Sequence, residues 1–246
     1  MKRRSVLAGI AAAFTAGCTK IGETDTFRGL VDGAETLHRG AHRLVGGRRP
    51  MAREFTVADL SPDFRGNGTI AIPTDAYQAQ LAAGFPAWRL AVTGLVERPL
   101  SLSLDHLQAL PQRTQITRHD CVEGWSAIGQ WTGPRLATIL QMARLREDAR
   151  YIVFRCADTL AGVPYYESCD LDDALHPQTL IAHRLNGEPL PEKNGAPLRL
   201  RIERQLGYKH AKYLTGIEAV ASLDGIGQGG GGYWEDRAGY QWYGGI

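Results

Sequence analysis

Short runs in which apolar and polar residues alternate recur along most of the chain after Met51. Trp88, Leu90 and Val92 alternate with more polar neighbours, which is the period of a strand with one buried face. Similar runs predict further strands at 114–117, 151–156, 179–184, 197–203 and 213–221, and the Asn186-Gly187 pair predicts a tight turn after the third of these.

Helical spacing of apolar residues occurs in two places. Ser103 can cap a short helix that carries Leu104, Leu107 and Leu110 and is closed by Pro111. Thr132 and Pro134 precede a second apolar series at helical spacing, which consists of Leu136, Ile139, Leu140 and Ala143. Strands therefore outnumber helices without regular alternation. We predict an α+β fold, with a mainly antiparallel mixed sheet and short helices.

The chain divides into three predicted parts, of which residues 51–246 form one domain. Residues 19–50 read as a tether with one short helix. Residues 1–18 have a basic start, an apolar run too short for the roughly 20 residues of a membrane span, and small residues up to Cys18. Arg3-Arg4 resembles a twin-arginine (Tat) export signal and residues 15–18 resemble a lipoprotein cleavage box. We expect a periplasmic or otherwise exported protein, with a general secretory signal as the alternative and a lipid anchor at Cys18 left open.

The charge balance argues against one class of partner. The 28 basic residues barely exceed the 26 acidic ones, whereas a nucleic-acid-binding surface normally brings a strong basic excess. We therefore expect no nucleic-acid partner.

Three other patterns carry little weight. The glycine-rich run 225–230 has the letters of a dinucleotide fingerprint, but more glycine and a Tyr-Trp pair follow it instead of a helix. His38 and His42 have helical zinc-site spacing without an obvious third ligand. Cys156 and Cys169 could pair in an oxidising compartment, but their positions in the sequence do not show that they meet.

Cys121 is the most interesting cysteine, because it follows a predicted strand and has His119 close by. From the residues alone, it can be a nucleophile with His119 as base, a soft metal ligand or a small core residue. Composition by itself favours the core residue.

Several motifs occur in the order found in one known family. ITRHDCVEGWSAIGQWTG, NGAPLRL, LGYKHAK and GYWEDR resemble the molybdopterin-binding domain of the sulfite oxidase family. The resemblance runs from about Asp59 to the C-terminus. It is nearest to the exported bacterial branch, which includes the catalytic subunit of a periplasmic methionine sulfoxide reductase.

The resemblance implies a molybdenum-molybdopterin cofactor with the Cys121 thiolate as the metal ligand. Arg118 and His119, together with Asp120, flank this cysteine and are candidates to line the pocket as proton carriers or substrate anchors. Cys156 stands where the exported branch has a threonine that touches the cofactor. The remaining positions that match cofactor-binding positions of the family are Asn67, Gly68, Asn194, Arg199, His210, Ala211 and Lys212. Arg199 is expected on the polar face of its strand.

The expected function is that of an exported molybdenum-pterin oxidoreductase. We expect oxygen-atom transfer on a small-molecule substrate, either an S-oxide or an oxyanion, and electron transfer with a separate partner, since the sequence has no Cys-x-x-Cys-His haem motif. A membrane cytochrome is our hypothesis for that partner. The alternatives are a metal-free thiol enzyme that uses Cys121 and His119, and a cofactor-binding module without catalysis.

Overall fold

The structure is a computed structural model that describes residues 24–47 and 50–246. It divides into two compact units, Met1–Gly47 and Arg48–Ile246. The predicted leader 1–18, with its twin arginines and Cys18, lies outside the described residues.

The described part of the first unit is helix α2, Asp25–Gly46. The Thr24 side chain caps it by accepting a hydrogen bond from the Phe27 backbone N–H. With 22 residues, α2 is longer than the one short helix expected in the tether. No helix in residues 24–47 and 50–246 has the length and apolar character needed to span a bilayer.

The larger sheet of the second unit has five strands in the order β2-β1-β11-β5-β6. Their bounds are Leu90–Gly94 for β1, Leu100–Leu102 for β2, Tyr151–Leu160 for β5, Val163–Asp170 for β6 and Leu214–Val220 for β11. The β1–β11 pair is parallel, and the other neighbours are antiparallel. The predicted α+β class with a mainly antiparallel sheet is confirmed.

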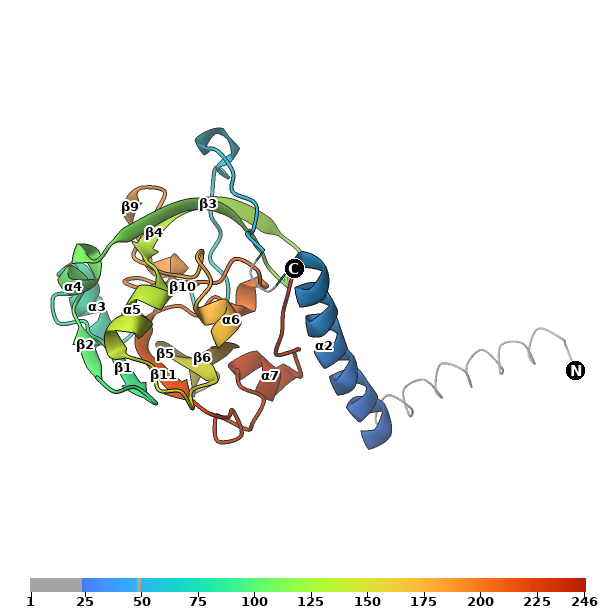
Figure 1. Ribbon diagram of the computed structural model, residues 1–246. Coiled ribbons are helices and arrows are strands. Elements are labelled where there is room, and N and C mark those ends of the chain that lie inside the picture. The colour runs from blue at the N-terminus through green and yellow to red at the C-terminus, as the bar shows by residue number, and fades with distance from the viewer. Residues whose placement is uncertain (1–23, 48–49) are drawn as a thin grey trace, which may run out of the picture. The chain divides into compact units, whose positions relative to one another are not determined.

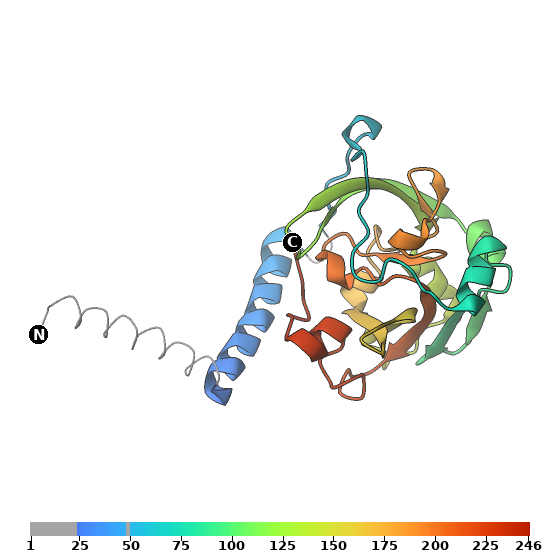
Figure 2. The ribbon, with the colours of Figure 1, turned by 180° about the vertical axis from the view of Figure 1, so that it is seen from behind.

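A second group of strands faces this sheet. A four-stranded sheet has the order β3-β4-β8-β9, and β7 pairs with β10. The bounds are Gln112–Asp120 for β3, Ser126–Pro134 for β4, Leu180–Ala182 for β7, Arg184–Leu185 for β8, Glu188–Pro189 for β9 and Arg199–Arg201 for β10. The long β3–β4 hairpin curves over the side of the unit opposite β5, β6 and β11 (Figures 1 and 2).

Short helices connect the strands. The α-helices are α3 (Asp75–Ala82), α4 (Leu104–Ala109), α5 (Leu136–Ala143), α6 (Leu171–Ala174) and α7 (Tyr233–Ala238). The 3-10 turns are η1 (Val57–Asp59), η2 (Glu192–Asn194) and η3 (Gly207–Lys209). As predicted, Ser103 caps α4. The predicted start of α5 is wrong, because Thr132 and Pro134 belong to β4 and the cap residue is Arg135.

Each predicted strand overlaps a strand of the structure, but the lengths often differ. The run 179–184 is broken into β7 and the start of β8, and 197–203 is strand only over β10. Asn186 and Gly187 have φ angles of 53° and 85°, which fits the predicted turn. Strands β2, β4, β6 and β9 were not predicted.

The main hydrophobic core lies on the five-stranded sheet. Leu90, Phe154 and Ile217 come from β1, β5 and β11, and Leu136 and Ile139 of α5 pack in the same cluster. Burial of these side chains fixes the strand ends from which the functional residues project.

Candidate functional site

A cavity opens where several loops meet at the ends of the strands. It contains about 640 Å³ of space not filled by atoms, part of it open to solvent. Five of the predicted site residues line it, namely Asn67, Gly68, Cys121, His210 and Lys212. The other lining residues are Thr69, Val122, Glu123, Asp158, Leu160, Tyr165, Gly207, Tyr208, Trp234 and Tyr240.

Cys121 stands in the turn between β3 and β4. Its backbone N–H donates to the Trp125 carbonyl at 2.9 Å, and its side chain is turned into the cavity wall, leaving the residue 8% exposed. The Asn67 amide Nδ2 lies 3.9 Å from Sγ and donates to it. Burial raises the pKa of the thiol, while the Asn67 hydrogen bond and the charge of Arg199 act to lower it. The sulfur is therefore placed where a ligand in the cavity can reach it.

Arg199 on β10 brings a positive charge that no carboxylate contacts. The side chain is fully buried, and its Nη1 donates to the Asn194 carbonyl at 3.2 Å. Its Nε and Nη2 have no hydrogen-bond partner. The expected polar face of this strand is thus enclosed by protein, because both faces of β10 are buried. A buried guanidinium with free donors is costly unless an anionic ligand accepts from it.

Lys212 and Asn194 hold the loop that contains Asn67. Lys212 Nζ donates to the backbone carbonyls of Asn67 and Thr69, and Asn194 Nδ2 donates to that of Arg65 at 3.3 Å. Burial, reinforced by the nearby charge of Arg199, lowers the pKa of Lys212 to about 7. This end of the cavity is rich in donors and suits a ligand with negative charge.

Arg118 and Asp120, which precede Cys121 in the sequence, do not line this cavity. The Arg118 side chain is 57% exposed and forms an ion pair with Asp120 at 2.9 Å, and both residues line a separate hollow with Arg53 and Glu203. The expectation that Arg118 and Asp120 line the cofactor pocket is wrong, since neighbours on a strand point to opposite sides.

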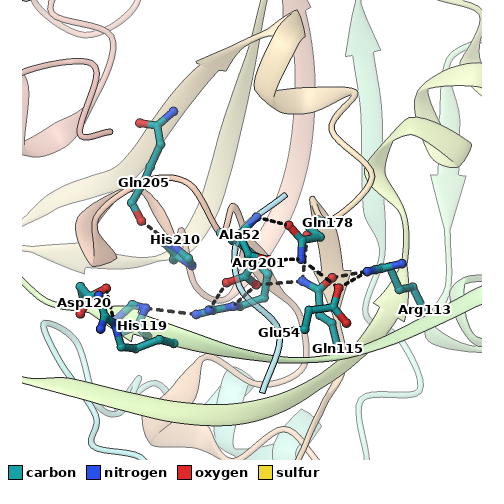
Figure 3. A network of polar contacts seen from close by, with 12 residues as sticks. Ala52, Glu54, Arg113, Gln115, His119, Asp120, Gln178, Arg201, Gln205 and His210 are labelled. Carbon is teal, nitrogen blue, oxygen red and sulfur yellow. Dashed lines mark hydrogen bonds and ion pairs between the residues drawn. The ribbon is translucent and has the colours of Figure 1, made fainter. Parts of the chain in front are cut away.

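His119 points inward but lies behind the cavity wall. Its Nδ1 accepts a hydrogen bond from Arg201 Nη1 at 3.1 Å, and its Nε2 is buried without a partner. Figure 3 shows the Arg201 side chain between His119 on one side and Gln115 on the other. The hydrogen bond found for Cys121 Sγ comes from Asn67, so the geometry does not support a His119-Cys121 nucleophile pair.

The other cysteines and Ala211 contribute no side chain to the cavity wall. Cys156 on β5 and Cys169 on β6 are both free thiols, and they do not form the disulfide left open by the sequence. Burial raises the pKa of each well above its usual value. The Ala211 carbonyl accepts from the Leu200 N–H at 2.8 Å. Cofactor contact by Cys156 or Ala211 stays a prediction.

One side of the cavity is an aromatic wall, which we define as Tyr165, Tyr208, Trp234 and Tyr240. The sequence pointed to an aromatic-rich tail but did not assign these side chains to the site. Asp158 was also missed. It is 4% exposed, its Oδ1 has no partner, and burial raises its pKa.

Together, the fold and the site define a molybdopterin-binding oxidoreductase domain. The chain belongs to the family described as the oxidoreductase molybdopterin binding domain, whose model matches residues 77–224.

Two curated relatives and one solved structure are similar to this chain. A protein of Azospira oryzae that carries the name of a protein-methionine-sulfoxide reductase subunit is 45% identical over 159 residues, which cover 65% of this chain and 56% of the relative. The protein-methionine-sulfoxide reductase catalytic subunit of Xanthomonas campestris is 38% identical over 161 residues, covering 61% and 50%. The sulfane dehydrogenase SoxCD from Paracoccus pantotrophus has a TM-score of 0.51 at 20% identity, covering 56% and 39%. The chain thus spans about half the length of the curated relatives it matches.

The family indicates a molybdenum-molybdopterin cofactor, and the residues present fit it. Several buried polar atoms near the cavity have no hydrogen-bond partner among the residues that the structure describes, namely Asn67 Oδ1, Asp158 Oδ1, Asn194 Oδ1, Arg199 Nε and Nη2, and His210 Nδ1. Buried polar groups are otherwise nearly always paired. A ligand with many hydrogen-bonding groups and a phosphate would satisfy such a set, and the Cys121 thiol supplies the soft donor that molybdenum needs.

Proposed function

We propose that the chain is the catalytic domain of an exported enzyme that reduces a small S-oxide by oxygen-atom transfer. The Cys121 sulfur in the cavity wall, beside the buried cation of Arg199, is the observation that carries this proposal. The names of the Azospira and Xanthomonas relatives support an S-oxide over another oxyanion.

Cys121 acts as the protein ligand of the metal in this proposal. The bound molybdenum centre supplies two-electron oxygen-atom chemistry. Cys121 holds the centre at the end of β3, and the Asn67 amide orients the sulfur by its hydrogen bond. That bond also favours the thiolate, which is the form that binds metal.

The basic residues hold the organic part of the cofactor. We assign Arg199 and Lys212 to its negatively charged end, because both are buried cations close to one another. Asn194 and His210 offer unpartnered polar atoms to the pterin. Gly68, Ala211 and Cys156 complete the proposed contact set from the family motifs. Arg118 is left out, because its side chain faces the separate hollow.

The aromatic wall selects the substrate. Tyr208, Trp234 and Tyr240 present mainly apolar surface to the cavity, together with Leu160 and Val122. Such a surface favours an S-oxide with hydrocarbon substituents over a fully ionised small anion, which would lose its hydration there.

Electrons come from a separate partner. Reduction of an S-oxide to a sulfide consumes two electrons and two protons and releases water. We assign electron supply to a membrane cytochrome and place the enzyme in the periplasm, where a lipid anchor at Cys18 would keep it near that membrane. Loss of S-oxide reduction when the haem-containing membrane fraction is omitted, with recovery on adding it back, would support this assignment. Equal reduction without that fraction would contradict it.

The decisive experiment compares Cys121→Ser with Cys169→Ser, a control that removes a buried thiol outside the cavity lining. Protein from a molybdenum-replete host is analysed for metal, for pterin by fluorescence after release, and for turnover of an S-oxide, an N-oxide and sulfite. We expect Cys121→Ser to keep pterin and lose turnover, and the control to keep both. Unchanged turnover in Cys121→Ser refutes the ligand role, and sulfite oxidation without S-oxide reduction refutes the substrate class.

A further inference from the structure

A buried ionic cluster lies outside the set of residues used above. Lys209 Nζ contacts Glu167 Oε2 at 2.5 Å and Glu235 Oε1 at 2.6 Å. The three side chains are at most 2% exposed. They come from η3, β6 and α7, so the cluster ties together three segments that are far apart in the sequence.

The cluster contains one cation and two carboxyl groups. The two carboxylates raise the pKa of Lys209 beyond what burial takes away, so the ammonium keeps its proton at neutral pH. If both carboxyl groups were ionised, one negative charge would remain uncompensated in a site that water does not reach.

The unpaired carboxyl oxygens converge on one point. Glu167 Oε1 and Glu235 Oε2 have no hydrogen-bond partner, while Glu167 Oε2 also accepts from the Ser168 N–H at 3.1 Å. A Cβ atom on Gly232 would lie 2.4 Å from Glu167 Oε1 and 2.1 Å from Glu235 Oε2, so these oxygens are at most 4.5 Å apart. Two ionised oxygens at such a separation repel, and a proton on one carboxyl group removes that repulsion.

The other titratable groups that face the pair add no positive charge. They include Tyr165, Tyr166 and Cys169 on β6 and Cys156 on β5, and burial raises the pKa of each. Burial likewise raises the pKa of Glu167 well above its usual value, and the nearby negative charge of Glu235 adds to this rise.

We propose that Glu167 keeps a proton at neutral pH beside the Glu235 carboxylate and that the two side chains, with Lys209, form a clamp that fixes the aromatic wall of the cavity. Each member stands next to a wall residue in sequence: Glu235 follows Trp234, Lys209 follows Tyr208, and Glu167 is two residues after Tyr165 on the same strand. Loss of the proton would therefore weaken the attachment of α7 and η3 behind the substrate side of the cavity.

The clamp predicts a specific pH dependence. A carboxyl group whose pKa is higher in the folded than in the unfolded state contributes full stability below its unfolded pKa and loses it as pH rises toward the folded value. For the wild type we expect the folding equilibrium constant to fall by up to about tenfold per pH unit in that window. Glu167→Gln replaces the protonated group with a neutral amide, and Glu235→Gln leaves a single carboxyl group to balance the Lys209 ammonium, so both variants should flatten this slope.

The test uses the full cofactor-loaded chain. Infrared spectra in H2O and D2O at neutral pH should show a protonated-carboxyl band that disappears in Glu167→Gln and in Glu235→Gln. Glu218→Gln, which removes a half-buried carboxylate paired with Arg155, and Asp158→Asn, which removes another buried acid, should both leave this band in place.

Denaturation midpoints provide the second measurement. We expect the single Gln variants to be as stable as the wild type at mildly alkaline pH, and the double variant to be less stable at every pH, because Lys209 then lacks a counter-charge. A wild type without the band, or single variants that keep the wild-type slope, would overturn the protonation of Glu167.

Discussion

Arg201 donates a hydrogen bond from Nη1 to Nδ1 of His119 at 3.1 Å, so the only proton of the neutral imidazole is on Nε2. Both side chains are almost fully buried, and Arg201 also contacts Glu203 Oε2 at 2.6 Å. The guanidinium thus neutralises Glu203 and fixes the orientation of the ring two positions before Cys121.

Replacement of Arg201 should strongly reduce the stability of the folded protein. Arg201→Met keeps much of the side-chain volume but leaves the Glu203 carboxylate buried without its cation, and we expect a loss of about 3–5 kcal/mol in unfolding free energy. The matched control is Arg155→Met, which breaks the half-exposed pair with Glu218 and should cost at most about 1 kcal/mol. Urea denaturation of both variants measures the difference. Similar losses would show that the buried network does not carry the stability assigned to it.

Local signals in the sequence located several elements correctly. Ser103 supplies a side-chain cap, and the α4 prediction holds. Thr132 and Pro134 offered the same kind of signal, yet pairing of β4 with β3 and β8 places both residues in a strand. Partners of this kind lie far along the chain, and a local pattern does not contain them.

For the candidate site, too, some residues were predicted from the sequence and others depend on tertiary packing. Family motifs pointed to Asn67, Cys121 and Lys212, and the structure brings all three to one cavity. Arg118 is close to Cys121 in the sequence but lines the separate hollow, because neighbouring side chains on a strand point to opposite sides. The aromatic wall was missed because its members come from β6, η3, α7 and the segment after α7, which meet only through tertiary packing.

His210 should make the metal-free protein less stable in acid. Burial, with the charges of Arg201 and Arg199, lowers its pKa well below the usual value, so the unfolded chain binds a proton that the folded protein does not. Stability should fall below about pH 6.5, by up to about 1.4 kcal/mol per pH unit. His210→Gln can still donate to the Gln205 carbonyl, which accepts from Nε2 at 3.0 Å, and should have a shallower slope. Urea denaturation from pH 7 to 5 tests this, and an identical slope in the variant would rule out His210 as a source.

Lys212 should make anion binding depend on pH near neutrality. Since its pKa is lowered to about 7, metal-free protein should bind inorganic sulfate, whose own charge is constant in this range, more weakly as pH rises through that value and the ammonium loses its proton. Lys212→Met should bind weakly at every pH, whereas Lys212→Arg should keep binding and lose the pH dependence. Isothermal titration calorimetry from pH 6 to 8 separates the three proteins. A wild type with constant affinity over that range would contradict the role of this charge.

Gly207 lines the cavity next to His119, and the absence of a side chain at this position lets the His119 ring pack close behind it. A Cβ atom at this position would lie 2.6 Å from His119 Nε2, and the ring has little room to move, because it also contacts the rings of Phe64 and His210. Gly207→Ala should therefore cost about 1–3 kcal/mol of unfolding free energy through overpacking. It should also lower cofactor content, since Gly207 lines the cavity. Gly225→Ala is the control, because its added Cβ would meet no atom within 4 Å. Urea denaturation and released-pterin fluorescence measure both effects. If Gly207→Ala matched Gly225→Ala in stability and pterin content, the close packing of His119 against the cavity wall would not matter for the site.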